Sequence, residues 1–139
     1  MPYRSTFYPE HHLFYETLWG SVTLEEIRVF HEGNVRAVAE AQTPIHILVD
    51  VRDLKEFPTS IVQMKDVLHP IEGPNLYWMI LITNNGALIK FIGSIVIQLV
   101  LKNGRFRLLG SLEEALAFLE QADSTLDLSD FLPELAKQA

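Results

Sequence analysis

The chain contains no cysteine among its 139 residues, which excludes disulfides, thiolate nucleophiles and cysteine-ligated metal sites. It also lacks the glycine-rich phosphate loops G-x-x-x-x-G-K-[ST] and G-x-G-x-x-G. Basic residues are few: 11 Lys and Arg stand against 18 Asp and Glu, and the net charge is −7 at pH 7. A field of that sign disfavours phosphate backbones and anionic membrane surfaces, so we expect no nucleic-acid partner.

Apolar residues are plentiful, at 48% of the chain, which is enough for one domain to bury a core. The longest apolar run is interrupted by Lys90 and closed by Lys102, short of the roughly 20 residues of a membrane span. The first residues, MPYRSTFYPE, show no apolar segment of a secretory signal. With the absence of cysteine, these features predict a cytoplasmic protein that does not span a membrane. We expect one domain over 1–122 and an acidic amphipathic tail over 123–139.

The apolar periodicity predicts an N-terminal β-hairpin and then strands that alternate with helices. The expected fold class is therefore α/β, with a mixed, mostly parallel sheet of about five strands and about four helices. A capping box at Thr23 and Glu26 starts the first helix, in which Gly33 offers a kink as an alternative. The expected strands are 3–8, 12–19, 45–51, 77–83 and 105–109, and the expected helices are 23–41, 60–68, 87–101 and 111–122.

The stretch from Ile45 to Leu68 is the expected site of function, because ligands of α/β sheets collect beyond the carboxyl ends of strands. Asp50 interrupts the apolar strand, and Asp53 and Glu56 follow in what we interpret as a polar loop over 52–57. The three carboxylates are candidate metal ligands or an acid–base pair, although their spacing matches no calcium loop. A solvated charged loop is the simpler interpretation.

Three segments carry a resemblance to a known family: Gly20–Glu26 at the first helix, Leu48–Leu54 followed by Phe57–Ser60, and Arg105–Leu109 followed by Ser111–Leu119. Their order over most of the chain resembles the STAS fold, which anti-sigma-factor antagonists share with sulfate transporter tails. The likeness is strongest to the small SpoIIAA-like bacterial proteins. The resemblance implies a STAS-like domain that binds another protein and catalyses no reaction.

In the antagonists, the loop after the central strand carries an Asp-Ser-Ser-Gly signature, and an ATP-dependent anti-sigma kinase phosphorylates one serine at the helix start. By spacing from Asp50, Thr59 and Ser60 stand at the two serines, while Pro58 and Ile61 replace the aspartate and the glycine. The resemblance implies Ser60, or else Thr59, as a phosphorylation candidate. A plain helix N-cap is the simpler interpretation of Ser60. The implied partner-binding residues are Asp50, Asp53, Phe57, Pro58, Thr59, Ser60 and Gln63.

A helix over Ala87–Leu101 is apolar nearly all round, which indicates burial on more than one side. Burial of the second side of this helix would require a partner, so we expect either a homodimer or a site for a small lipophilic ligand. In the latter case, aromatic residues of the strands and of this helix are expected to line the ligand cavity. They are Trp19, Tyr77, Trp78 and Phe91.

No enzyme signature appears in the sequence, and we expect no cofactor and no metal. A Ser60–His69–Asp50 triad can be drawn, but no G-x-S-x-G elbow supports it. His31 lies near the apolar face of the first helix and is interpreted as a core or interface histidine. His11 and His12 are adjacent in an expected strand, so they would point to opposite faces.

Overall fold

The computed structural model describes residues 3–84, 86–101 and 105–129. Its sheet has the strand order β1-β2-β3-β4-β5. The strands are β1 (Tyr3–Tyr8), β2 (Leu13–Ser21), β3 (Ile45–Glu56), β4 (Leu76–Ile82) and β5 (Phe106–Leu109). The helices are α1 (Leu24–Glu40), α2 (Ile61–Val67), α3 (Ala87–Ile95) and α4 (Leu112–Ala122), with a 3-10 turn at Pro9–His11 and a π-helical turn, η2, at Val96–Val100.

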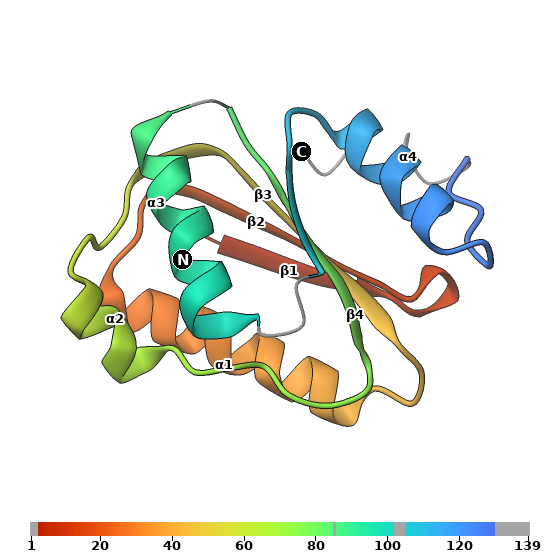
Figure 1. Cartoon of the computed structure of the whole chain (residues 1–139), viewed down its shortest axis with the longest axis horizontal. Coiled ribbons are helices and arrows are strands. Elements are labelled where there is room, and N and C mark those ends of the chain that lie inside the picture. The colour runs from red at the N-terminus through yellow and green to blue at the C-terminus, as the bar shows by residue number, and fades with distance from the viewer. Residues whose placement is uncertain (1–2, 85, 102–104, 130–139) are drawn as a thin grey trace.

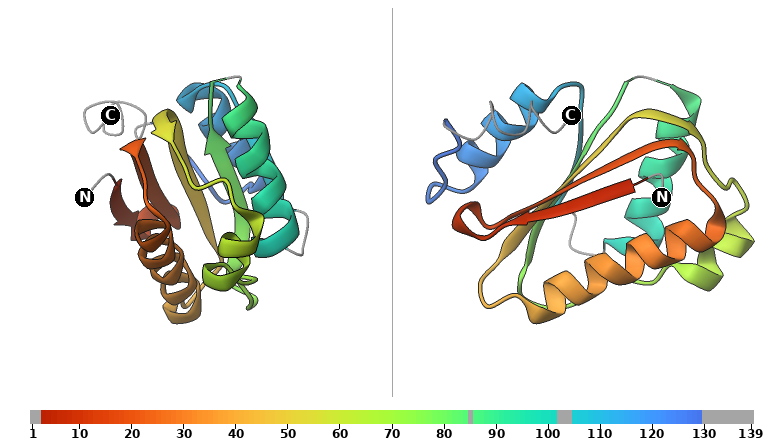
Figure 2. Two further views of the ribbon diagram at one scale, coloured as in Figure 1. Left: turned by 90° about the vertical axis from the view of Figure 1, so that its left-hand side faces the viewer. Right: turned by 180° about the vertical axis from the view of Figure 1, so that it is seen from behind.

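The pairing of the strands confirms the expected α/β fold. β1 pairs antiparallel with β2, and the pairs β2–β3, β3–β4 and β4–β5 are parallel. Each parallel connection steps to the next strand in the same direction, and such crossovers are right-handed, so α1, α2 and α3 share one face of the sheet. α4 lies on the other face (Figures 1 and 2).

Strand β3 is buried on both faces over its first seven residues. Ile47 and Val49 contact the core beneath α1, α2 and α3, whereas Leu48 contacts a second, smaller core beneath α4. A continuous apolar run is what a strand covered on both faces requires. Its apolar sequence therefore places β3 at the centre of a three-layer arrangement.

The carboxyl end of β3 corrects the sequence interpretation, because the strand continues to Glu56 where a loop was expected from Arg52. β2 is also longer than expected and passes through Gly20 and Ser21, with Gly20 at φ +67° and a register shift beside it. The two extensions pair with one another, and the amide of Val22 donates to the carbonyl of Glu56 at 3.0 Å. Charged residues on β3 obscured this pairing in the sequence.

The helix starts follow the predicted capping, with one long unbroken helix. Thr23 and Glu26 form a reciprocal capping box, and α1 then runs through Gly33 to Glu40 without the alternative kink. The strand expected from His12 begins one residue later, at Leu13, because His11 ends the 3-10 turn and His12 has a left-handed backbone at φ 52°. The expected helix over 87–101 is present, but its last turn is π-helical.

The chain after α4 packs back onto the second core. Leu128 is 2% exposed, and its backbone amide donates to the Glu120 carboxylate at 2.8 Å. Asp123 lies 3.0 Å from the buried imidazole of His46 on β3. The part of the expected tail that the structure describes, 123–129, thus contacts the sheet layer. The remainder of that tail, 130–139, lies outside the described residues.

Replacing Leu128 with alanine tests whether this segment belongs to the folded unit. Loss of a buried leucine leaves a cavity, so we expect the free energy of unfolding to fall by about 2–5 kcal/mol in urea titrations. Leu108→Ala is the matched control, because Leu108 is 41% exposed and should cost less than about 1 kcal/mol. Equal losses in the two variants would show that 123–129 is not part of the cooperative domain.

Candidate functional site

The connection from β3 to α2 lies on the surface, as the docking interpretation requires. Phe57 and Pro58 are half-buried, and Thr59 and Ser60 are exposed. The Ser60 hydroxyl oxygen accepts a hydrogen bond from the Gln63 amide at 3.2 Å and so caps α2. Ser60 therefore has the local role that the sequence predicts, and its hydroxyl stays open to solvent.

α2 buries much less of its surface than its sequence suggests. The spacing of Ile61, Met64 and Leu68 predicts one buried face, yet Ile61 is 44% exposed and Met64 alone is fully buried in the helix. Val67 and Leu68 pack, partly buried, against the core. Val62, on the outer side, is 74% exposed, so two β-branched apolar side chains face solvent beside Ser60.

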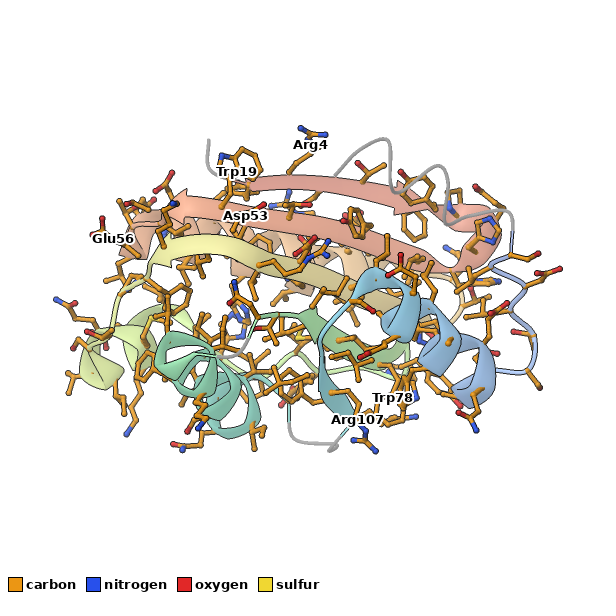
Figure 3. The ribbon with its side chains drawn as sticks, turned by 90° about the horizontal axis from the view of Figure 1, so that it is seen from above. Arg4, Trp19, Asp53, Glu56, Trp78 and Arg107 are labelled. Carbon is orange, nitrogen blue, oxygen red and sulfur yellow. The ribbon has the colours of Figure 1, made fainter. Side chains whose placement is uncertain are left out.

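The three carboxylates of β3 are not brought together. Asp50 is 5% exposed, Asp53 is exposed beside Trp19, and Glu56 accepts from the Ser21 hydroxyl at 2.9 Å (Figure 3). From Asp50 to Glu56 an extended strand spans about 20 Å. Among the described residues, no group of three or more acidic or histidine side chains has the geometry to hold a metal ion.

Asp50 lies on the face of the sheet opposite to α2, so the structure separates it from Thr59 and Ser60. Its carboxylate forms a two-point ion pair with Arg52, at 3.0 Å from Nε to Oδ1 and 2.7 Å from Nη2 to Oδ2. This hydrogen bonding raises the pKa of Arg52. Burial, with the charge of Asp50, raises the pKa of the neighbouring Tyr15. Since both carboxylate oxygens are engaged, Asp50 serves as an internal ion-pair partner.

The members of the candidate hydrolytic triad have other partners. Ser60 caps α2, Asp50 pairs with Arg52, and the ring Nδ1 of His69 lies 3.3 Å from the Pro70 carbonyl oxygen. The backbone amide of His69 instead donates to Nε2 of the buried His31 at 3.2 Å. His31 is thus a core histidine, and burial lowers its pKa to about 4.

A buried polar row beneath β1 and β2 was not recognised in the sequence. Glu16 is 1% exposed, and its Oε2 accepts from the Ser5 hydroxyl at 2.8 Å. Asn34 of α1 hydrogen-bonds to the same carboxyl from the other side. Burial raises the pKa of Glu16 to about 8, so the carboxyl is neutral at pH 7. One signal was available: Glu16 shares a strand face with Phe14 and Leu18.

An apolar cavity of about 70 Å³ lies between the sheet and the layer of α1, α2 and α3. Its only polar side chains are His31 and Asn34. Two aromatic side chains, Phe30 and Phe57, reach it, in place of the four aromatic residues expected to line a ligand cavity. The lining is Leu18, Ile27, Phe30, His31, Asn34, Val49, Val51, Phe57, Leu68, Met79, Leu81, Ile92, Ile95, Val96 and Val100.

Those four aromatic residues lie elsewhere. Trp78 packs edge-on against Phe118 at 4.9 Å, beneath the guanidinium of Arg107 at 5.0 Å (Figure 3). Tyr77 packs against the His46 ring at 5.1 Å. Trp19 is 36% exposed at the end of the sheet that α4 does not reach. Phe91 packs, half-buried, against the core of the three-helix face.

Comparison of the chain with protein-family models, and with the sequences of characterised proteins, finds no match. Over the described ranges, no helix has the length and apolarity that crossing a membrane demands.

The buried carboxyl of Glu16 gives a pH dependence with a defined sign. Between 4.5 and about 8 the folded state keeps a proton that the unfolded state has lost, so stability falls as pH rises, by up to about 1.4 kcal/mol per pH unit. His31 and His46, whose pKa values burial lowers, have the opposite effect, which fades above pH 6.5 as the unfolded imidazoles lose their protons. From pH 6.5 to 8 we therefore expect unfolding free energies from urea titrations to fall in the wild type relative to Glu16→Gln.

Glu113→Gln provides the matched control at an exposed glutamate and should keep the wild-type slope. If Glu16→Gln also kept that slope, Glu16 would not be the group that retains the proton.

Proposed function

We propose that the protein is a non-catalytic protein-binding module that docks through the tip of α2. This docking tip comprises residues Phe57, Pro58, Thr59, Ser60, Ile61, Val62 and Gln63. The observation that carries the proposal is the exposure of Ile61 and Val62, at 44% and 74%, directly after the exposed Ser60. Each such side chain contributes about 1.5–3 kcal/mol when a partner covers it fully.

The resemblance to anti-sigma-factor antagonists supports the same surface, because their phosphorylated serine also stands at a helix start after the central strand. On this basis the proposed partner is an anti-sigma kinase-like protein in the cytoplasm of a bacterium. Phosphorylation of Ser60 would add close to two negative charges at the edge of an apolar contact, and desolvating them would weaken docking. The buried Asp50 is not part of this surface, and Asp53 lies at the rim of the sheet, on β3.

A photo-crosslinking amino acid at Val62 tests the docking tip. We expect it to capture a partner from a lysate of the source cell, whereas the same group at Val29, an exposed valine of α1, should not. Ser60→Asp should reduce the capture about fivefold or more, equivalent to about 1 kcal/mol. Ser60→Asn is the matched control, because Asn and Asp cap helices equally well and differ in charge.

Equal capture at Val62 and Val29 would contradict docking at α2. Equal behaviour of the aspartate and asparagine variants would contradict regulation by charge at Ser60 while leaving the docking surface in place.

The cavity favours a second candidate function, the binding or carriage of a small lipophilic ligand. Its walls include Ile92 and Ile95 of α3 and Val96 and Val100 of η2, within the apolar segment that the sequence singles out. The aromatic contribution expected from the strands is replaced by Phe30 and Phe57. A site buried beneath α3 can coexist with docking at α2.

Self-association is a third proposal, through the outer side of the Ala87–Leu101 segment. Ile97 is 57% exposed and Leu108 of the edge strand β5 is 41% exposed, and both line a shallow groove that also contains Gly93. A second copy placed here would cover the apolar side chains and lie along the edge of the sheet.

Native mass spectrometry of protein purified without detergent tests both of these proposals. For carriage, we expect a bound mass that disappears after denaturation. For self-association, we expect a dimer that Ile97→Glu abolishes and that Lys90→Glu, a charge change on the same helix, weakens less. A monomer without any added mass at every concentration would reject both proposals.

A further inference from the structure

We propose that the cavity beneath α3 is a binding site for a small neutral molecule with an apolar body and one hydrogen-bond donor, such as an alcohol or a phenol, which Asn34 recognises. This inference rests on the second candidate function and goes beyond it by naming the recognising atom and the ligand class. Apart from Phe57, which belongs to both, the cavity residues are distinct from those of the docking tip on α2.

The first argument is an acceptor without a donor at the cavity wall. Asn34 is 2% exposed and lines the cavity, and its Oδ1, like the Oε1 of the neighbouring Glu16, has no hydrogen-bond partner among the described residues. Leaving a buried carbonyl oxygen unpaired is costly, so such an atom in a folded protein calls for an explanation. A ligand hydroxyl that donates to Oδ1 supplies one.

The second argument is the chemistry of the remaining wall. Among the described residues of the lining, every side chain apart from Asn34 and His31 is apolar, and none is a lysine or an arginine. The Nε2 atom of His31 already accepts from the His69 amide, and its lowered pKa keeps the ring uncharged. A carboxylate or phosphate ligand would find no counter-charge in this wall, which leaves a neutral ligand.

The third argument is the helical segment at one side of the cavity, since α3 and η2 both contribute lining residues; α3 lies over the sheet in Figure 1. α3 ends in the π-helical turn η2, in which the Leu101 amide donates to the Val96 carbonyl at 2.8 Å. Val96 and Val100 of this turn line the cavity. π-helical turns are rare and occur frequently at functional sites.

The volumes of the cavity and of a neighbouring groove indicate the route by which a ligand enters. The cavity holds about 70 Å³, whereas sites for small molecules usually measure about 300 Å³ or more. Phe30 separates it from an outer groove of about 270 Å³ that contains Tyr3, Ser5 and Glu16. Phe30 is half-buried and rests edge-on against Tyr3, with 5.6 Å between ring centroids. Rotation of the Phe30 ring joins the two spaces and admits a ligand past the row Ser5–Glu16–Asn34.

A matched pair of probes, phenol and toluene, tests this inference on the intact chain. Titrations followed by methyl NMR should shift the signals of Ile27, Ile92 and Val96 with both probes. In the wild type, phenol should also shift the Asn34 side-chain amide signals, and toluene should not. Asn34→Leu should change the ratio of the two dissociation constants about fivefold or more in favour of toluene, because it removes one hydrogen bond. Comparing ratios cancels the different hydration of the two probes.

Phe30→Ala should speed the exchange of both probes. Three results would overturn the inference. One is the absence of methyl shifts in both the wild type and Phe30→Ala, as for a closed packing void. Another is a ratio that Asn34→Leu leaves unchanged. The last is an Asn34 side-chain amide signal that phenol does not shift, as expected when the protonated carboxyl of Glu16 already donates a hydrogen bond to Oδ1 of Asn34. The first also rejects the lipophilic-carrier function, whereas the other two reject only the recognition by Asn34.

Discussion

The burial of β3 on both of its faces is the constraint from which the rest of the structure follows. A strand with apolar side chains on both of its faces must be covered on both, so it can lie neither at an edge of the sheet nor under a single layer of helices. The three right-handed connections supply helices to one face, and the last helix must then cover the other. α4 reaches only part of that second face. Polar and charged side chains such as Asp50 and Arg52 occupy part of this face.

The distribution of apolar side chains among the three helices of the larger core explains why α2 has an exposed tip. α1 and α3 carry the apolar side chains that close most of the larger core, and α2 adds Met64 as its one fully buried residue. The side chains of the first turn of α2 contribute little to this core. Ile61 and Val62 accordingly face solvent.

The sequence predicted the architecture well wherever a pattern was local and repeated. The apolar runs of β3 and β4 and the capping box at Thr23 located their elements to within a few residues. The extension of β3 to Glu56 escaped prediction because it depends on pairing with β2, thirty-odd residues earlier in the chain. The charged residues in that extension adopt strand geometry because they pair with β2, although their own β propensity is low.

The candidate sites were less predictable, for a related reason. The hydroxyl of Ser60 was foreseeable, since an N-cap is a feature of neighbouring residues. The pairing of Asp50 with Arg52 and the cavity wall at Asn34 depend on which face each side chain meets and on what covers it. Glu16 shows the limit most clearly: a glutamate on an apolar strand face is visible in the sequence, but the asparagine beside it comes from another element.

The strand order of the sheet has a consequence for biosynthesis. Since β1 to β5 lie side by side in the order in which they are translated, each strand finds its neighbour already outside the ribosome. No strand has to wait for a later one to be inserted between itself and its partner. The nascent chain can thus build the sheet from one side to the other, and the face that α4 covers stays bare until residues 112–122 have emerged.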